Sequence, residues 1–362
     1  MEGLKLARVQ GQAVLDRLVD EFGIRVDLTE RLGIPGLRPG SRVYRVKGVS
    51  RSSQVYILDA PELKDVACHP HIVGDELIAL MERAALDASR VLLELTPIKE
   101  AGEDALVFEH ILRAAPGYRL HAALQSLGIR FREVWVRPRY KLPSYRDHDE
   151  EATKEIEIIY EDFSQLPEGV ELTVLKPDTE ASGKTAEASL RRLVEEAEKR
   201  GSNPRDLIIY GFISEPGLRV VEETARRLGF KQIYFLAAGD VTALCHNMYD
   251  MPLYGPDESY YSEHHELKRL GGVADHETLE RYIPEFIPGA DQPGDWSARQ
   301  KLVYTGTGYE PGGIEKHLKN SIELIERLWS ISKPEPWFME FHEEAAKREL
   351  ELLRMKLAEL KA

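Results

Sequence analysis

A strand, a short polar loop and an amphipathic helix follow one another between residues 172 and 200, and this stretch constrains the fold more than any other. Leu172 to Leu175 is an apolar, β-prone run, and the loop from Pro177 to Thr185 is small and polar. The helix after it repeats apolar residues at helical spacing on one face. The first N–H groups of a helix have no partner within the helix, and its dipole favours an anion there. The stretch therefore predicts a phosphate-binding loop, although an ordinary capped connection has the same pattern.

Two kinds of phosphate loop fit these residues to different degrees. A P-loop reads G-x-x-x-x-G-K-[ST], and Gly183-Lys184-Thr185 matches its end. Asp178 occupies the first glycine position, where a carboxylate would face the phosphates and a Cβ suits the tight turn poorly. The stretch from Asp178 to Thr185 resembles more closely the loop with which type I phosphoribosyltransferases bind phosphoribosyl pyrophosphate (PRPP).

Composition and charge narrow the class of protein. The chain has 362 residues, 43% of them hydrophobic and 30% charged, which predicts a globular protein with one large or two smaller units. A net charge of −14 argues against non-specific nucleic-acid binding. Cys68 and Cys245 are far apart, so no disulfide framework is predicted. Because neither a signal segment nor an apolar run of membrane length is present, we expect a cytoplasmic protein without nucleic-acid or membrane partners.

Strand-like and helical segments alternate along the middle of the chain. A helix is predicted over residues 74–87, with an apolar run at 90–95 after it. Further strands are predicted at 106–112, 132–137, 156–160, 207–213 and 232–236. Strands separated by helices predict an α/β protein with a parallel sheet whose ligands bind at the carboxyl ends of the strands.

The two ends of the chain have their own patterns. Residues 43–46 and 54–58 predict a β-hairpin, and two helices are predicted after residue 311. We therefore predict an N-terminal helix and hairpin extension (1–66), an α/β domain (67–310) with an insertion at 241–280, and a C-terminal helical extension (311–362).

The order of short motifs resembles that of uracil phosphoribosyltransferase, a type I phosphoribosyltransferase. The likeness runs from about His69 to Arg299. Its motifs are Ile111-Leu112-Arg113-Ala114, Tyr145-Arg146-Asp147, Phe212 to Leu218, Ala237-Ala238-Gly239-Asp240 and Phe286 to Asp295. Each motif is weak alone, and their shared order carries the resemblance. It implies a parallel sheet flanked by helices, with a flexible hairpin hood between residues 137 and 160.

The resemblance also implies a function and a set of site residues. It implies a homodimer that makes UMP from uracil and PRPP in pyrimidine salvage, with Mg²⁺ on the PRPP. Asp178 and Arg113 are the catalytic residues implied. The PRPP-binding residues implied are Asp178, Thr179, Glu180, Ala181, Ser182, Gly183, Lys184, Thr185, Arg113, Ala114, Arg137, Arg139 and Arg146. The base-binding residues implied are Ile287, Pro288, Gly289, Gln292 and Asp295, and no metal ligand from the protein is predicted.

Two other functions fit the same sequence. Pro177 stands where the resembled family has an acidic or loop-opening residue, and Gln292 replaces one of its aspartates. These departures favour a sensor or scaffold that binds PRPP or a nucleotide without catalysis. A P-loop kinase is the second alternative, because of the Gly183-Lys184-Thr185 end of the loop.

Overall fold

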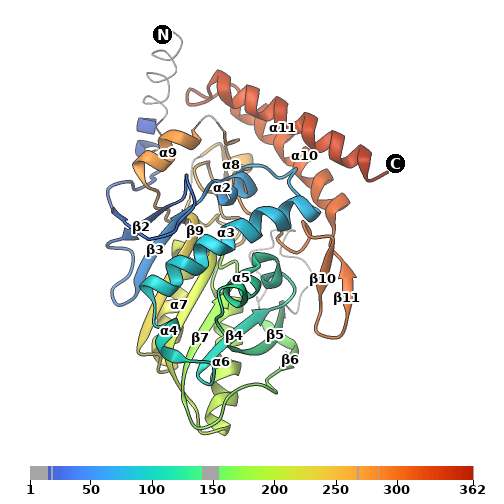
Figure 1. Ribbon diagram of the computed structural model, residues 1–362. Helices are drawn as coiled ribbons and strands as arrows, with labels where there is room; N and C mark the ends of the chain where they lie inside the picture. The colour runs from blue at the N-terminus through green and yellow to red at the C-terminus, as the bar shows by residue number, and fades with distance from the viewer. Residues whose placement is uncertain (1–14, 18, 141–154, 267–268, 284, 362) are drawn as a thin grey trace.

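The computed structural model of the chain describes all residues except 1–14, 18, 141–154, 267–268, 284 and 362. Its main feature is a sheet of nine described strands in the order β1-β2-β3-β9-β8-β7-β4-β5-β6 (Figure 1). These strands are β1 (Thr29–Leu32), β2 (Arg42–Val46), β3 (Gln54–Asp59), β4 (Leu106–Ile111), β5 (Arg132–Tyr140), β6 (Ile156–Asp162), β7 (Glu171–Pro177), β8 (Asn203–Ser214) and β9 (Gln232–Thr242). From β3 to β5 every neighbouring pair is parallel, which confirms the predicted α/β class.

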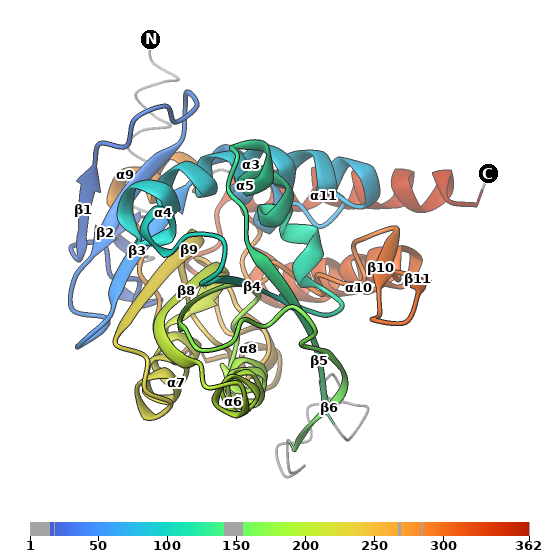
Figure 2. The ribbon, with the colours of Figure 1, turned by 60° about the horizontal axis from the view of Figure 1, so that its bottom comes forward.

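Helices cover both faces of this sheet (Figure 2). One face packs against α2 (Pro61–Cys68), α3 (Gly74–Leu95), α4 (Ile98–Ala101), the 3₁₀ turn η1 (Ala115–Tyr118) and α5 (Leu120–Ser126). The other face packs against α6 (Lys184–Lys199) and α7 (Glu215–Arg227). The helices α6 and α7 both begin where the sequence predicts a helix after a strand. The carboxyl ends of the parallel strands therefore all open on the same edge of the sheet.

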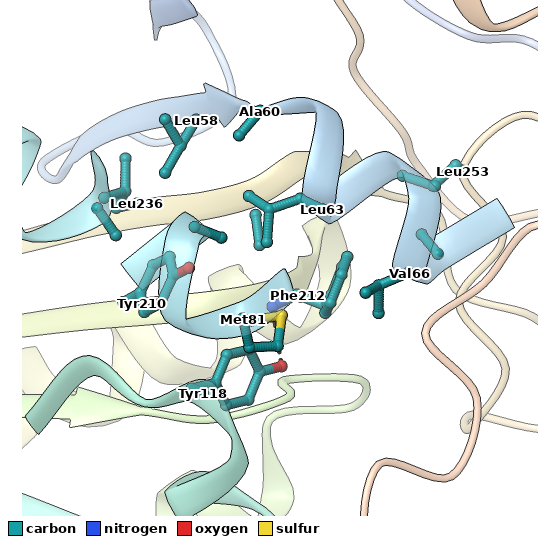
Figure 3. Packing of buried hydrophobic residues seen from close by; sticks show 14 of the residues in the cluster. Leu58, Ala60, Leu63, Val66, Met81, Tyr118, Tyr210, Phe212, Leu236 and Leu253 are labelled. Carbon is teal, nitrogen blue, oxygen red and sulfur yellow. Dashed lines mark hydrogen bonds between the residues drawn. The ribbon is translucent and has the colours of Figure 1, made fainter. Parts of the chain in front are cut away.

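Alternation along β8 explains why both faces are buried. Tyr210 and Phe212 belong to the core under α2 and α3, whereas Ile209 and Ile213 belong to the core under α6 and α7. Successive side chains of a strand point to opposite faces, so a run that is apolar throughout must be covered on both sides. Figure 3 shows the first of these cores, with Met81 of α3 lying among the side chains of α2 and β8.

Two predictions about the first hundred residues have different outcomes. The hairpin is confirmed, because β2 and β3 are antiparallel with Val43 opposite Leu58. β3 also pairs with β9, so the hairpin extends the central sheet. The predicted end of the helix at residue 87 is wrong, because α3 continues to Leu95. An apolar run such as 90–95 suits a buried helix as well as a strand, and no helix breaker occurs before Pro97.

The chain after β9 covers the carboxyl edge of the sheet and ends in two helices. Its elements are α8 (Glu258–His264), α9 (His276–Tyr282), β10 (Leu302–Tyr304), β11 (Tyr309–Pro311), α10 (Ile314–Ser332) and α11 (Glu340–Glu359). The predicted C-terminal helices are thus confirmed, and they pack on each other through a third core cluster (Figure 1). None of the described helices is both long and apolar enough to span a bilayer.

Candidate functional site

A cavity of about 620 Å³ opens at the carboxyl ends of β4, β5 and β7. It is lined by residues from five separate parts of the chain, and ten of the predicted site residues are among them. These ten are Arg113, Ala114, Arg137, Arg139, Asp178, Thr179, Ala181, Thr185, Gln292 and Asp295. Residues up to 182 positions apart in sequence, from Arg113 to Asp295, thus surround one space.

The path of the loop after β7 decides which of its N–H groups can meet a ligand. The backbone N–H groups of Asp178 and Glu180 donate to the carbonyl oxygens of Tyr210 (2.9 Å) and Phe212 (2.8 Å) in β8. The turn that leaves the sheet is therefore only Ala181 to Gly183, and within the described residues the backbone N–H groups of this turn make no hydrogen bond. Among the described residues no side chain caps α6, so the N–H groups of its first turn are also available to an anion.

A buried lysine lies beneath this loop. Lys176 Nζ is 2.6 Å from Asp178 Oδ2 and 3.2 Å from Glu180 Oε1, and Lys176 and Glu180 have no exposed surface. The backbone N–H of Thr179 donates to the other oxygen of Asp178 (2.8 Å). Burial disfavours the charge on Lys176, but the carboxylates of Asp178, Glu180 and Glu109 outweigh this effect and raise its pKa. Lys176 thus holds Asp178 at the cavity wall.

Two carboxyl groups of this cluster make stability depend on pH. Burial raises the pKa values of Glu109 and Glu180 to about 7, against an ordinary value of 4.5. Between these values the folded chain binds more protons than the unfolded chain, so the free energy of unfolding falls as pH rises from about 4.5 to about 7. Glu109→Gln should flatten this fall in urea titrations across that range, whereas Glu198→Gln at the exposed end of α6 should not. Identical pH slopes in the wild type and both variants would contradict the prediction.

The opposite wall carries two arginines that already face a carboxylate. Arg113 follows β4 and Arg137 lies at the bulge of β5. Arg113 Nη1 is 3.4 Å from Glu310 Oε2, and Arg137 Nη2 is 3.9 Å from the same oxygen. Burial and the neighbouring Arg113 charge lower the pKa of Arg137. Glu310 belongs to β11, so the β10–β11 hairpin places an internal anion beside the arginines.

We expect the carboxylate of Glu310 to compete with an anionic ligand for these arginines. Glu310→Gln removes the negative charge and keeps the shape, and it should tighten binding of inorganic pyrophosphate about two- to fivefold, the range of an exposed ion pair. Isothermal titration at low salt measures this, with Glu315→Gln in α10 as the control. Unchanged or weaker binding in Glu310→Gln would show that the arginines do not receive the anion.

Several predicted residues do not line the cavity. Ser182 is buried in the turn and Lys184 is exposed, while Glu180 points inward to Lys176. Gly183 has a φ of 74°, and a Cβ there would lie 2.8 Å from the carbonyl oxygen of Gly217, so it serves the turn itself. Residues 287–289 do not line this cavity, and Ile287 packs in the core shared with α10 and α11, so their contact with a base stays a prediction. Arg146 lies outside the described residues.

Other lining residues were not predicted. Met251 comes from the segment predicted as an insertion, and Trp296 follows Asp295 and stacks on Tyr118 with ring centroids 4.9 Å apart. Tyr118 in turn shares a hydrogen bond with Thr179 (2.6 Å), which couples the loop to this aromatic pair. Only the fold brings Met251, Trp296 and Tyr118 together. The sequence could have indicated Trp296, because it directly follows the predicted site residue Asp295.

A second cavity of about 440 Å³ adjoins the first. The two share four lining residues, Tyr249, Gln292, Gly294 and Asp295. Most of the other residues that line the second cavity belong to α10, among them His317 and Glu323. The wall that carries Gln292 and Asp295 therefore borders both cavities.

Comparison with known protein families and with curated proteins gives no match. Among solved structures, the AQ2163 protein from Aquifex aeolicus is 18% identical, with 54% of this chain and 91% of that chain covered and a TM-score of 0.38. A hypoxanthine phosphoribosyltransferase from Staphylococcus aureus is 14% identical (49% and 81% covered, TM-score 0.28). An adenine phosphoribosyltransferase from Trypanosoma brucei, in complex with AMP, pyrophosphate and ribose-5-phosphate, is 14% identical (51% and 82% covered, TM-score 0.33). Because these identities and TM-scores are low, we argue the function from the geometry of the cavity alone.

Proposed function

We propose that this chain is a PRPP-dependent phosphoribosyltransferase that joins ribose-5-phosphate to a nucleobase, with uracil as the acceptor and UMP as the product. One observation carries the proposal. The unpaired backbone N–H group of Ala181, an aspartate, two arginines and a separate polar wall line a single cavity at the carboxyl edge of a parallel sheet. A donor with a phosphate, a ribose and a pyrophosphate needs the first three of these groups, in that order along its length, and the polar wall remains for the acceptor.

Each part of the cavity has a role in this proposal. The N–H group of Ala181 and the hydroxyl of Thr185, two residues that line the cavity, bind the 5′-phosphate at the start of α6. Asp178 receives the ribose hydroxyls, and Arg113 and Arg137 bind the pyrophosphate as it leaves. These charges stabilise a transition state in which positive charge grows at the anomeric carbon and negative charge grows on the leaving group.

Mg²⁺ belongs to the proposal as an ion carried by PRPP. It prefers oxygen ligands and keeps several waters, so the oxygens of the pyrophosphate supply most of its shell. Asp178 and Asp295 are the aspartates that line the cavity, and a carboxylate is the protein ligand this ion prefers. The ion would neutralise charge on the pyrophosphate.

The acceptor would lie against the wall that carries Gln292 and Asp295. The side-chain amide of Gln292 has both a donor and an acceptor, which is what the edge of uracil requires. Its Nε2 donates to the carbonyl oxygen of Gly289 (3.3 Å) and its Oε1 accepts from the N–H of Met251 (3.2 Å), which fixes the orientation of the amide. We further propose that the chain acts as a homodimer, which light scattering would test.

The proposal is tested by mixing the purified chain with PRPP, Mg²⁺ and a panel of pyrimidines and purines, and by measuring the pyrophosphate released. Release with uracil supports the full proposal, and release with another base corrects the acceptor. Arg113→Ala and Arg137→Ala should each lower kcat/KM for PRPP by about a hundredfold, because each removes a charged hydrogen-bond donor to the leaving group. Arg132→Ala, at the far end of β5, is the matched control. No PRPP binding by the wild type would refute the proposal.

A sensor that binds PRPP without turnover is the second candidate, and the surroundings of Asp178 favour it. One oxygen of its carboxylate pairs with Lys176 and the other accepts the N–H of Thr179, so a ribose hydroxyl must share oxygens that already have partners. Calorimetry separates the two functions. The sensor binds PRPP and releases no pyrophosphate with any base, whereas the transferase releases pyrophosphate.

A further inference from the structure

Two histidines and a glutamate meet outside the cavity described above, between the α2–α3 connection and α11. His69 and His71 lie on either side of Pro70, and Glu349 lies in the middle of α11. Nδ1 of His69 is 3.2 Å from Glu349 Oε2. Nδ1 of His71 is 2.8 Å and 2.9 Å from the two carboxylate oxygens. One ligand atom from each residue lies within 4.8 Å of the other two.

These separations are close to those of a metal site. Imidazole nitrogen and carboxylate oxygen bind Zn²⁺ at about 2.0–2.2 Å, and two atoms bound to one tetrahedral ion at that distance lie roughly 3.3 Å apart. The nitrogen–oxygen separations here are 2.8–3.2 Å. The nitrogen–oxygen pairs would therefore need to separate by only about 0.1–0.5 Å to take up an ion.

The backbone that carries the two histidines is held in place by a buried arginine. Arg299 donates to the carbonyl oxygens of His69 (3.1 Å), Val66 (2.8 Å) and Ile72 (2.8 and 3.2 Å). The backbone N–H of His71 donates to Glu349 Oε1 (2.9 Å), which orients the carboxylate. Ligands held in advance lose little freedom when they bind an ion, and such supporting contacts are typical of metal sites.

The exposure of the two histidines and the charge of Glu349 also suit the binding of a metal ion. The side chains of His69 and His71 are 18% and 13% exposed, whereas that of Glu349 is 3% exposed. An ion can thus arrive from solvent past the imidazoles and meet a carboxylate that is shielded from water. Three protein ligands also leave a coordination position open for a water molecule.

We propose that His69, His71 and Glu349 bind one Zn²⁺ ion, which joins α11 to the connection between α2 and α3. The proposal does not depend on the transferase function, because none of the three residues lines the PRPP cavity. Its physical effect is to tie the C-terminal helix to the sheet domain, since binding to the folded state alone stabilises that state.

The test uses the full chain, stripped with EDTA and titrated with Zn²⁺ by calorimetry. We expect one equivalent to bind with micromolar or tighter affinity, and Zn²⁺ to raise the Tm. His69→Ala, His71→Ala and Glu349→Gln should each weaken binding more than about tenfold. His276→Ala, at an exposed histidine of α9, should bind like the wild type. Co²⁺ gives a second readout, because an ion bound by histidine and carboxylate develops visible absorption bands that the variants should lose.

Two results would overturn the proposal. The first is a wild-type chain that binds no Zn²⁺ in the micromolar range, in which case the cluster is an ion pair between imidazoles and a carboxylate. The second is binding that His69→Ala and His71→Ala leave unchanged, which would place the ion elsewhere. The histidine variants decide the matter if circular dichroism shows that Glu349→Gln does not fold, because their side chains are partly exposed and tolerate truncation.

Discussion

Lys176→Met should lower the free energy of unfolding by about 3–5 kcal/mol, the cost of removing one partner from a buried ion pair. Methionine keeps the length and the packing of the lysine stem, so the loss is the loss of charge. Without the ammonium group, the carboxylates of Asp178, Glu180 and Glu109 would share a buried site with no cation among the described residues around them. Urea denaturation of the two chains at pH 8 measures the difference.

The loss of unfolding free energy caused by Lys176→Met should be smaller at low pH. Glu109 and Glu180 have pKa values of about 7 even beside the lysine, so at pH 5 they are protonated and need no cation. Lys199→Met, at the exposed end of α6, is the control and should cost little at either pH. A deficit below about 1 kcal/mol at pH 8, or one that is equal at both pH values, would show that Lys176 does not hold this cluster together.

The strands and the loop could be predicted because local chemistry determines them. Residues 207–213 of β8 are a largely apolar run, and α7 starts at Glu215-Pro216-Gly217, where proline suits the first turn of a helix. The loop from Asp178 to Thr185 could be recognised from its small residues between a strand and an amphipathic helix. In each case the pattern that makes the element is contained within about fifteen residues.

Contacts between distant segments could not be predicted in the same way. Glu310 reaches Arg113 across 197 positions, and nothing near either residue indicates the other. Lys176 stands at the end of a β-prone run, where a surface lysine has the same appearance, and only the fold shows that it is buried among acids. Ile287 was predicted to border the base, whereas the fold packs its side chain in a core with residues of α10 and α11. A motif predicts where the backbone turns, whereas packing decides which side chains face the cavity.

Gly211→Ala should destabilise the chain by about 3 kcal/mol or more and, on the proposed function, weaken PRPP binding more than about tenfold. Gly211 has a φ of 152°, which strongly favours glycine, and a Cβ there would overlap the carbonyl oxygen of Asp178 and lie 3.1 Å from the ring of Tyr118. The strand cannot move aside easily, because the neighbouring Tyr210 carbonyl holds the N–H of Asp178 (2.9 Å). The added methyl group must therefore push the loop into the cavity or break its pairing with β8.

A second glycine separates the cost of backbone strain from the cost of the collision. Gly128 has a φ of 79° and open space where a Cβ would lie, so Gly128→Ala should cost only the strain, about 1–2 kcal/mol, and leave PRPP binding unchanged. Urea denaturation and calorimetry with PRPP on both variants make the comparison. If Gly211→Ala loses no more stability than Gly128→Ala and binds PRPP like the wild type, the close approach of the loop to β8 is not what positions Asp178. If Gly211→Ala loses both more stability and PRPP binding, Gly211 in β8 is as necessary for the conformation of the loop from Asp178 to Thr185 as the residues of that loop.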